Sequence, residues 1–492
     1  MAYSYTKRPF GINCVSYFEE PTGIGEGANR ILNVLAKMGI PYLKRTPTSN
    51  KIEYEGDEFR PGIRRPYSIN LIHLNAHRTT SLAQLIPGWF SGGYNIGFWN
   101  WEFSKFSESL CENFIFFDEI WVPSTFAFNS ISSVSPIPIK HIPYPCLSGS
   151  SSTQGVQWRE RLHLPSDGFM FLFVFDLRSY FDRKNPLAII EAFRRAFGNK
   201  SDACLVLKTT HAGEYPHLLH LLQRKIGHSQ NIRLVDATYS RIEIRDLMAA
   251  CNAYVSLHRS EGFGLTMLDA MAAGKPVIAT NYSGNVDFMN ERNSLLVDYR
   301  LIPNNKAWGP YEKGFLFADP DIEQAAQYMA KLENDREFAV NLGQVARKFV
   351  LQEFGEDKIG HEIRATLEAI HTSHRSSAKE SFDVFHVAQE LCRNKLEDIS
   401  QFKVRSHRPI FGRLIDKTRA VLRLLLWPLL DRQTAHNRLV NETITALVRS
   451  LASQQKTVAE AVKLLDEIKK ETIQKQGKSR SVPKASFYQC VE

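Results

Sequence analysis

Short apolar runs alternate with amphipathic segments along most of the chain. The runs in the first part are PFGINCVSYF, YSINLIHL, YNIGFWNW, DEIWVPS and IKHIPYP, and those in the second part are FMFLFVFDL, ACLVLKTT, NIRLVDAT, NAYVSLHR and KPVIATN. Helical patterns such as GANRILNVLAKMG and NPLAIIEAFRRAF lie between most of them. Strands that are apolar along their length and alternate with helices are typical of parallel sheets covered on both faces. The pattern therefore predicts an α/β protein with two Rossmann-like lobes.

The small residues of SGSSSTQGV (148–156) separate the two halves of this pattern and predict a linker. We predict an N-terminal lobe over residues 1–147 and a C-terminal lobe over residues 157–372, whose last helix crosses back to the first lobe. Residues 373–475 predict a helical extension and residues 476–492 a disordered tail. A chain of 492 residues is long enough for this organisation.

The composition narrows the class of protein. With 43% hydrophobic and 23% charged residues, the chain has the composition of a soluble globular protein. Its seven cysteines are scattered without a CxxC pair, which favours free thiols in a reducing compartment. No apolar run approaches the roughly 20 residues that span a bilayer, and the N-terminus has no continuous apolar stretch typical of a signal peptide. We therefore expect a cytoplasmic protein.

Polar side chains follow the predicted strands of the second lobe at their carboxyl ends. Ligands of open parallel sheets bind beyond these ends, so the polar residues there are expected to converge on one site. They are Asp176, Arg178, Lys208, Thr209, Thr210, His258, Ser260, Glu261, Asn281 and Ser283.

Two cations follow the first of these strands, in the sequence RSYFDRK. Arg178 and Lys184 lie six residues apart, on the turn and at the start of the next helix. Such a pair suits a pyrophosphate leaving group in a reaction that uses no metal. The alternative is a pair of solvated loop charges.

The segment SLHRSEGFGLTMLDAMAAGKPVIAT (256–280) places Glu261 and Asp269 eight residues apart around a glycine-bearing turn. Glu261 can hydrogen-bond sugar hydroxyls, and Asp269 can reach a ribose diol if a nucleotide lies along the helix; the alternative for Asp269 is a surface acid. Backbone N–H groups at the start of the helix can hold a phosphate or a developing negative charge. They belong to Gly262, Phe263, Gly264, Leu265 and Thr266.

These residues resemble the retaining glycosyltransferases of family 4, also called group 1, which have the GT-B fold. The resemblance covers roughly residues 8–370. The family's donor-phosphate Arg and Lys match Arg178 and Lys184, and its N-terminal Gly-rich loop matches the segment with Gly23 and Gly25. Its frame E-GFG-…-E-A-…-G-PV-A matches Glu261, Gly262, Phe263, Gly264, Asp269, Ala270, Gly274, Pro276, Val277 and Ala279.

The resemblance implies two lobes that face each other across a cleft. It places a nucleotide-sugar donor on the C-terminal lobe and an acceptor on the N-terminal lobe, and it implies retention of the anomeric configuration. Close backbone approach at Gly23 and Gly25 would serve the acceptor or the donor phosphates. It implies no metal and no cofactor, the nucleotide sugar being a substrate.

The chain departs from the family pattern at three places. Asp269 stands where the family usually has Glu, and the sequence SGNVD (283–287) replaces the usual Gly-Gly-x-Pro-Glu. Where many members have a histidine after an N-terminal-lobe strand, this chain has Trp99, Asn100, Trp101 and Glu102. A subgroup that acts on bacterial surface polysaccharides is similar through this Trp-Glu pair. Glu102 is a candidate for orienting the acceptor or the donor sugar, and core packing is the alternative.

Several other polar residues have structural interpretations. His258 and Arg259 either line the donor site or brace the turn, and His73 and His77 are interpreted as hydrogen-bonded histidines without a catalytic role. The sequence Asp319-Pro320-Asp321 imitates a metal-binding DxD motif, but it precedes a helical pattern, so we predict a helix cap there.

The basic character of the chain is C-terminal. Residues 403–438 hold nine Lys or Arg and two Asp, and so supply most of the net charge of +9. Within them, residues 409–430 place apolar side chains on one helical face and basic ones mostly opposite, a pattern typical of a helix at an anionic membrane surface. A helix docked on the protein is the alternative. Residues 437–472 show 3-4 spacing that predicts a coiled coil and hence a homodimer. Nucleic acid is not expected as a partner.

We conclude from the sequence that the chain is a retaining hexosyltransferase. It would transfer a sugar from a nucleotide-sugar donor to a glycan or lipid-linked acceptor in bacterial surface polysaccharide synthesis, in the cytoplasm or on the inner membrane surface. Arg178, Lys184, Glu261 and Glu102 are the predicted catalytic residues. Two alternatives stay open: an inactive sugar-nucleotide-binding scaffold of a polysaccharide assembly complex, and a GT-B sugar-nucleotide epimerase.

Overall fold

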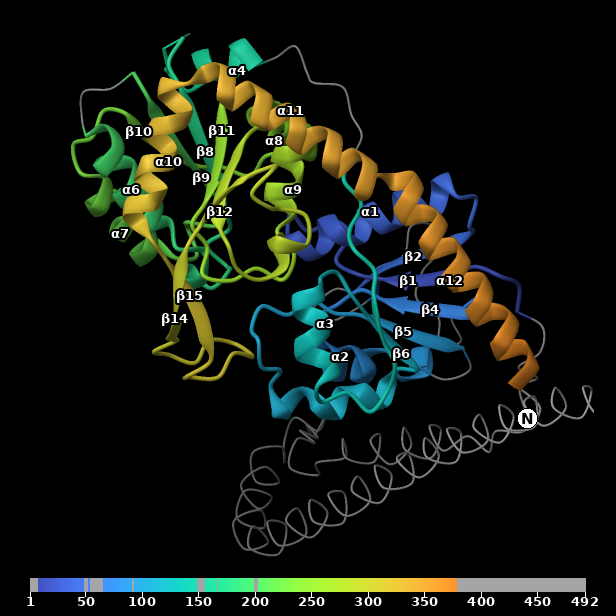
Figure 1. Ribbon diagram of the computed structural model, residues 1–492. Coiled ribbons are helices and arrows are strands. Elements are labelled where there is room, and N and C mark those ends of the chain that lie inside the picture. The colour runs from blue at the N-terminus through green and yellow to red at the C-terminus, as the bar shows by residue number, and fades with distance from the viewer. Residues whose placement is uncertain are drawn as a thin grey trace, which may run out of the picture. The chain divides into compact units, whose positions relative to one another are not determined.

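The computed structural model describes residues 8–47, 52–53, 65–90, 93–147, 155–165, 167–198 and 202–377. Within these ranges the chain forms two α/β lobes, each built on a mainly parallel sheet, and both lobes belong to one compact unit (Figure 1). The two-lobe α/β fold predicted from the sequence is therefore confirmed. Most of the predicted linker, the basic segment 409–430, the predicted coiled coil 437–472 and the tail 476–492 lie outside the described residues.

The N-terminal lobe contains a seven-stranded sheet in the order β3-β2-β1-β4-β5-β6-β7. Neighbouring strands pair parallel, except that β3 pairs antiparallel with β2. The strands are β1 (Ile12–Val15), β2 (Tyr42–Pro47), β3 (Ile52–Glu53), β4 (Ile69–Ile72), β5 (Tyr94–Phe98), β6 (Glu119–Val122) and β7 (Ile139–His141). The helical elements are α1 (Gly23–Lys37), α2 (Ala76–Leu85), η2 (Pro87–Phe90), η3 (Glu108–Phe116) and α3 (Thr125–Ser132).

The C-terminal lobe contains a six-stranded parallel sheet in the order β10-β9-β8-β11-β12-β13. Its strands are β8 (Met170–Val174), β9 (Cys204–Thr209), β10 (Ile232–Asp236), β11 (Ala253–Ser256), β12 (Val277–Thr280) and β13 (Leu295–Val297). Its helical elements are α4 (Gly155–Arg161), α5 (Phe181–Lys184), α6 (Pro186–Phe197), α7 (Pro216–Ile226), α8 (Arg241–Ala250), α9 (Leu265–Ala272), η4 (Gly284–Asp287), α10 (Ile322–Asn334) and α11 (Arg336–Glu353). The central strands β8, β9, β11 and β12 are almost wholly buried, as apolar runs in a sheet covered on both faces require.

The last described helix, α12 (Glu356–Ser377), follows the C-terminal lobe in sequence and packs against the N-terminal lobe (Figure 1). Arg364 donates from Nη1 to the carbonyl of Met38 at 3.0 Å. Lys140 of β7 donates from Nζ to Thr366 Oγ1 at 2.7 Å. The end of the described chain is thus held by both the start and the last strand of the N-terminal lobe.

A two-stranded antiparallel hairpin stands apart from both sheets. Its strands are β14 (Tyr299–Pro303) and β15 (Leu316–Pro320), and Figure 1 shows it extending from the C-terminal lobe. Three of its aromatic side chains, Tyr311, Phe315 and Phe317, belong to a buried cluster with Trp101 and Phe103, which follow β5. The hairpin therefore ties the two lobes together through aromatic packing.

No helix in the described part of the chain is long and apolar enough to cross a membrane. Among the cysteines that the structure describes, Cys14, Cys146, Cys204 and Cys251 are buried free thiols, and Cys111 is half-buried.

One glycine contact limits how closely α11 packs on the turn between α9 and β12. A Cβ atom at Gly343 would lie 2.0 Å from the carbonyl oxygen of Gly274. Because both partners are backbone atoms, a side chain at this position must push the helix away from the sheet.

We expect Gly343→Ala to lower the free energy of unfolding by about 1–3 kcal/mol, the usual cost of overpacking. Gly213→Ala is the matched control, because a Cβ at Gly213 meets no atom within 4 Å. Urea unfolding monitored by circular dichroism measures both. Equal midpoints for the two variants would contradict the contact.

Candidate functional site

Glu261 lies in the turn between β11 and α9, at the carboxyl end of the C-terminal sheet. Its carboxylate accepts hydrogen bonds from Lys184 Nζ at 2.5 Å and from Arg183 Nη1 at 3.0 Å. The three side chains are 12%, 18% and 7% exposed, in the order Glu261, Lys184, Arg183. The structure therefore brings together Glu261 and Lys184, which the sequence analysis proposed, and adds Arg183, which it did not.

The charges in this group compensate one another. Burial alone would raise the pKa of Glu261, but Lys184 and Arg183 outweigh burial and lower it to about 2. Burial lowers the pKa of Lys184, and the neighbouring carboxylate opposes that change. For Arg183 burial is the largest single effect and lowers the pKa, but Glu261, Glu102 and Tyr311 together outweigh burial and raise it. Two cations thus share one carboxylate, and the charge of Glu102 acts on both cations as well. The N–H groups at the start of α9 add a partial positive charge that favours an anionic ligand.

Local hydrogen bonds hold the turn in shape. The backbone N–H of Glu261 donates to Ser283 Oγ at 2.8 Å, and the N–H of Gly284 donates to the Glu261 carbonyl at 3.0 Å. Ser283 has a φ of 78°, and a Cβ at Gly284 would lie 2.5 Å from the Gly262 carbonyl oxygen. The two segments, one after β11 and one after β12, can therefore approach only because residue 284 is glycine.

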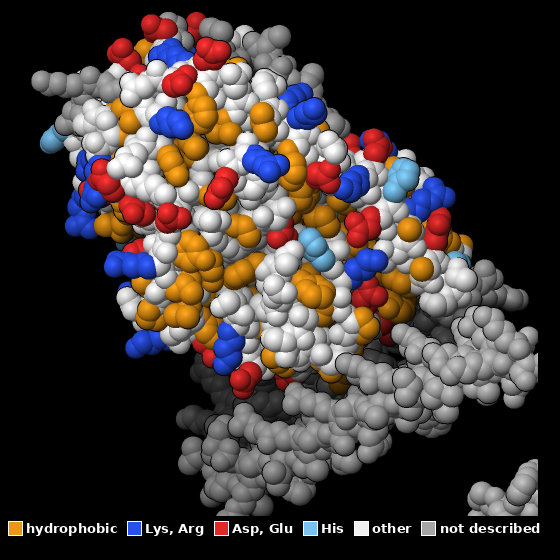
Figure 2. All heavy atoms as spheres, viewed as in Figure 1, with side chains coloured by type: hydrophobic (Ala, Val, Ile, Leu, Met, Phe, Trp, Pro, Cys, Tyr) orange, Lys and Arg blue, Asp and Glu red, His pale blue; other side chains and the backbone are white. Residues whose placement is uncertain are grey.

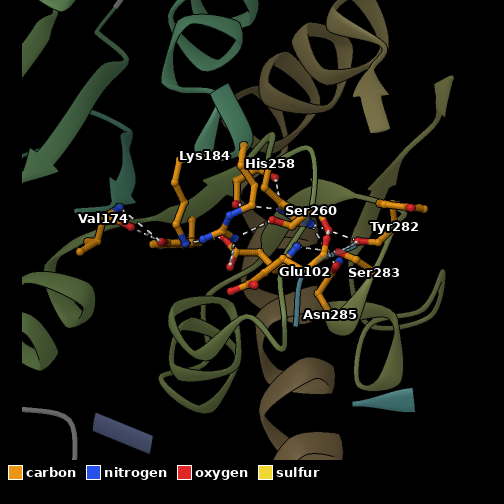
Figure 3. Close-up of polar contacts among 12 residues, drawn as sticks. Glu102, Val174, Lys184, His258, Ser260, Tyr282, Ser283 and Asn285 are labelled. Atoms are coloured by element: carbon orange, nitrogen blue, oxygen red, sulfur yellow. Dashed lines mark hydrogen bonds and ion pairs between the residues drawn. The ribbon is translucent and has the colours of Figure 1, made fainter. Parts of the chain in front are cut away.

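His258 supports this turn through hydrogen bonds. It is fully buried, its Nε2 lies 3.0 Å from Asn285 Oδ1, and its Nδ1 lies 3.0 Å from Ser256 Oγ. Figure 3 shows His258, Ser283 and Asn285 gathered around the turn. With both ring nitrogens engaged and burial lowering its pKa, His258 acts as structural support. Of the two interpretations that the sequence allowed, the geometry favours bracing.

Glu102 meets this turn from the N-terminal lobe. Its carbonyl accepts a hydrogen bond from Ser260 Oγ (Figure 3). Its Oε2 accepts one from the hydroxyl of Tyr311 of the hairpin at 2.5 Å. Glu102 is 9% exposed. Because Glu102 is hydrogen-bonded to both the C-terminal lobe and the hairpin, apolar core packing alone does not account for it. Its role in chemistry stays a prediction.

Arg178 does not join the Glu261 cluster. Its guanidinium pairs with Glu214 at 2.5 Å, and the side chain is 42% exposed. The sequence spacing suggested that Arg178 and Lys184 act together, but it is Arg183, adjacent to Lys184, that shares Glu261. The contribution of Arg178 to donor binding stays a prediction.

Asp269 pairs across the lobes. Its Oδ2 accepts a hydrogen bond from Arg30 Nη2 of α1 at 2.7 Å, and Arg30 also donates to Glu26 at 2.9 Å. Glu26 in turn pairs with Arg241 of α8 at 2.7 Å. Arg30 is 1% exposed, so its charge depends on these acids. Asp269 Oδ1 is buried and has no hydrogen-bond partner among the described residues, and the ribose contact of Asp269 stays a prediction.

The glycines predicted to form a phosphate loop begin α1 instead of a loop. Thr22 caps this helix, its Oγ1 accepting from the N–H of Gly25 at 3.2 Å. A Cβ at Gly25 would lie 2.4 Å from the Tyr17 carbonyl, whereas Gly23 is exposed with open space around it. Gly23 is thus the position where a ligand can approach the backbone, and Gly25 serves packing.

The start of α9 combines buried side chains with available N–H groups. Phe263 is 3% exposed and packs against Tyr144 with ring centroids 5.4 Å apart, so its side chain belongs to the core. Gly264, with φ of 101°, forms the N-cap. Leu265 and Thr266 make up the first turn, whose N–H groups can face a phosphate.

Other candidate residues are structural. Asp321 caps α10 by accepting from the N–H groups of Glu323 and Gln324, as predicted. Asp319 pairs with Arg259 at 2.9 Å, so Arg259 braces the hairpin. Among the described residues no cluster of three or more His, Cys, Asp or Glu side chains could hold a metal ion. A cavity of about 270 Å³ borders Arg259 and Asp319, but none of the predicted site residues lines it.

His73 lies in a buried polar network of the N-terminal lobe. Its Nε2 lies 2.9 Å from the hydroxyl of Tyr144, which also contacts Asn100. Burial lowers the pKa of His73 to about 3, so the ring is neutral at pH 7. Its Nδ1 has no hydrogen-bond partner within the described ranges, so the interpretation as a hydrogen-bonded histidine holds for one ring nitrogen. His77 is exposed at the surface.

The C-terminal lobe is similar in sequence to known proteins. Residues 156–349 match the family model described as "Glycosyl transferases group 1". A curated relative, N-acetyl-alpha-D-glucosaminyl L-malate synthase of Bacillus anthracis, is 26% identical over 174 residues, which are 35% of this chain and 38% of that protein.

Solved structures with a similar fold cover most of the described chain. HepE of Anabaena in complex with UDP and glucose has a TM-score of 0.53 at 14% identity and covers 73% of this chain and all of its own. A glycosyltransferase from Rickettsia africae has a TM-score of 0.56 at 15% identity, over 73% of this chain and 98% of its own. Sucrose-phosphate synthase from Thermosynechococcus elongatus also has a TM-score of 0.56, at 16% identity, over 74% of this chain and all of its own. The chain therefore has the GT-B fold, and its C-terminal lobe matches the group 1 glycosyltransferases.

The lowered pKa of Glu261 predicts how stability depends on pH. A carboxylate whose folded pKa lies below its ordinary value of 4.5 contributes stability above that pH and loses it as the pH falls toward 2. For this shift the contribution is about 3 kcal/mol. In urea unfolding at pH 7, 5, 4 and 3, wild type should exceed Glu261→Gln in stability at pH 7, and the difference should shrink below pH 4.5.

Glu214→Gln is the control for this experiment. Glu214 also forms an ion pair, but an exposed one, so its removal should change stability little at any of these pH values. A gap between wild type and Glu261→Gln that stays constant from pH 5 to pH 3 would contradict the assignment of an ionised, paired Glu261.

Proposed function

We propose that the chain is a metal-independent, retaining glycosyltransferase that moves a hexose from a nucleotide-sugar donor to a glycan or lipid-linked acceptor. The observation that carries the proposal is the cluster of Glu261, Lys184 and Arg183 at the start of α9. It offers a carboxylate for sugar hydroxyls beside cations for a diphosphate. The group 1 match over residues 156–349 and the neighbour bound to UDP and glucose support a nucleotide-sugar donor.

In this proposal Arg183 keeps Glu261 ionised while Lys184 changes partner. Arg183 is fixed by two hydrogen bonds, to the Glu261 carboxylate and to the Ser260 carbonyl at 2.8 Å. Lys184 contacts Glu261 through its terminal ammonium, a flexible point charge that can turn toward a diphosphate. As the bond from the sugar to the diphosphate breaks, negative charge grows on the leaving oxygen. Lys184 and the N–H groups of residues 262–266 would stabilise it.

Glu261 and Glu102 would then flank the reacting sugar. Glu261 holds the sugar hydroxyls, and Glu102, held by Tyr311, faces the same turn from the N-terminal lobe. Asp269 would contact the ribose only after its Oδ1, which is buried in the structure, becomes accessible, while Arg30 holds its other oxygen. Arg178 would reach the diphosphate only by leaving Glu214.

We further propose, from the sequence of residues 403–438, that the protein attaches reversibly to an anionic membrane surface and acts on a lipid-linked acceptor of bacterial surface polysaccharide synthesis. These residues lie outside the described part of the chain, as does the predicted dimerisation segment 437–472. A cytoplasmic location at the inner membrane follows from the same proposal.

The proposed role of Lys184 in stabilising the leaving group predicts that Lys184 contributes more to turnover than Arg178 does. A charge-assisted contact is worth about 1.5–3 kcal/mol, so Lys184→Ala should lower turnover roughly tenfold to a hundredfold. Arg178→Ala should have a smaller effect, because Arg178 is exposed and already paired. Release of nucleotide diphosphate, measured with a panel of UDP-, GDP- and dTDP-sugars in the presence of EDTA, tests both. Activity of Lys184→Ala equal to wild type, or loss of all wild-type activity in EDTA, would contradict the proposal.

The same assay separates the alternatives. An inactive scaffold would bind a donor without releasing nucleotide diphosphate, and an epimerase would convert the donor sugar without an acceptor. Transfer of the sugar to an acceptor identifies a transferase. If NMR shows that the product has the anomeric configuration of the donor sugar, the transferase is retaining.

The membrane proposal predicts salt-dependent binding to vesicles. Each basic residue near an anionic surface is worth about 1 kcal/mol. Replacing Arg413, Lys417, Arg419 and Arg423 by Gln in the full-length chain should therefore release it from vesicles of phosphatidylglycerol and phosphatidylethanolamine at low salt, where wild type co-sediments. If wild type stays in the supernatant, the attachment is refuted.

A further inference from the structure

The hairpin of β14 and β15 carries an unusual concentration of exposed apolar side chains. Tyr299 is 40% exposed, Leu301 50%, Trp308 37% and Leu316 42%. Figure 2 shows hydrophobic side chains gathered over the region of this hairpin, with basic side chains at its margins. Exposed apolar side chains that lie together in a patch often mark a binding surface, whereas single exposed apolar residues are common on any protein.

Trp308, at the tip of the hairpin, differs from the other tryptophans that the structure describes. Trp89, Trp99, Trp101, Trp121 and Trp158 are at most 4% exposed. The indole of Trp308 instead presents part of its surface to solvent, and no described residue accepts a hydrogen bond from its N–H.

The indole is held rigidly despite its exposure. Its ring is nearly parallel to that of Tyr180, with centroids 5.4 Å apart and planes at 7°, and to that of Tyr311, at 6.0 Å and 9°. Trp308 and Tyr311 also exchange two backbone hydrogen bonds, at 2.9 and 3.0 Å. A preorganised aromatic surface loses little conformational entropy when a ligand covers it.

Both stacking partners connect Trp308 to the candidate active site. Tyr180 precedes α5, the short helix that supplies Arg183 and Lys184. Tyr311 donates its hydroxyl to the carboxylate of Glu102. The exposed indole therefore lies at the edge of the site, one ring away from the elements that carry Glu102 and the donor-lobe cations.

We propose that Trp308 is a stacking platform for a sugar ring of the acceptor, so that the acceptor is a saccharide that extends past the reacting position. The negative face of an indole attracts the partly positive C–H groups on one side of a pyranose. The indole N–H and the exposed Lys306 and Lys313 supply donors for its hydroxyls or acidic substituents. This inference rests on the proposed glycosyl transfer and names its acceptor class.

A saccharide fits this surface better than a lipid chain does. A lipid surface would use the apolar side chains of the hairpin together. The stack instead orients the single ring of Trp308, and the exposed Lys306 and Lys313 lie on the same hairpin loop. The two occupants differ in which residues matter. Binding of a saccharide should depend on Trp308 and not on Leu301, which lies on the same hairpin outside the stack. Binding of a lipid surface should depend on both residues to the same extent.

Binding is tested with a broad array of bacterial and eukaryotic oligosaccharides, probed with the full-length protein. Wild type should retain a defined set of glycans, Trp308→Ala should lose them, and Trp308→Phe should recover part of the signal because it keeps an aromatic face. Leu301→Ala should bind as wild type does. A retained glycan should also protect wild type from acrylamide quenching of tryptophan fluorescence, and this protection should be absent in Trp308→Phe.

Enzyme kinetics provide a second, independent test of the role of Trp308. With a retained glycan as acceptor, Trp308→Ala should raise the acceptor KM about two- to tenfold, the range expected for loss of one aromatic stacking contact, and leave the donor KM unchanged. Circular dichroism and thermal unfolding of the variants show whether the hairpin substitution disturbs the fold.

The outcomes separate this inference from the proposed function. Glycan binding that depends on Trp308 without release of nucleotide diphosphate from any donor keeps the platform and refutes the transferase. Glycosyl transfer with an unchanged acceptor KM in Trp308→Ala keeps the transferase and refutes the platform. Absence of any glycan binding by wild type, or vesicle binding lost equally in Trp308→Ala and Leu301→Ala, also overturns it.

Discussion

The buried charge of Glu261 is the constraint on which the site depends. An ionised carboxylate away from water is costly unless cations and hydrogen bonds compensate it. Lys184 and Arg183 supply that compensation from α5, a helix of four residues. The chain can place two adjacent cations there because Asn185, with φ of 53°, ends α5 and begins α6 at once. The left-handed backbone at Asn185 thus helps to place the two cations beside one carboxylate.

The lobes meet through polar groups around the same point. Ser124 Oγ donates to the Gly262 carbonyl at 2.6 Å, and the N–H of Thr125 donates to Asp287 at 2.7 Å. Together with Glu102 and the Arg30–Asp269 pair, these bonds surround the start of α9 with groups from the N-terminal lobe. Because Glu261, Lys184 and Arg183 are at most 18% exposed at this point, their charge interactions are stronger than they would be in open solvent.

The sequence predicted the parts of the fold that depend on local pattern. Apolar runs gave the central strands of both sheets, because strands buried on both faces must be apolar along their length. β2 was not predicted, since Lys44 and Arg45 interrupt its pattern, and the hairpin was missed because its outer face is exposed. The candidate site likewise has a part that the sequence predicted and a part that it did not. Glu261 and Lys184 follow from motif and spacing. The pairing of Asp269 with Arg30, 239 residues away, and of Tyr311 with Glu102, 209 residues away, depends on tertiary structure that no spacing encodes.

The position of α12 has a consequence for how the protein is made. The N-terminal lobe is synthesised first, yet part of its surface is covered by residues 356–377, which leave the ribosome only after the whole C-terminal lobe. Ser68, for example, hydrogen-bonds His371 at 2.8 Å, 303 positions later in the chain. Until then the face of α1 that contacts α12 stays uncovered, and the nascent lobe exposes apolar surface while its partner is still being translated. Folding of the first lobe is therefore completed by the last described helix, and the two lobes mature as one unit.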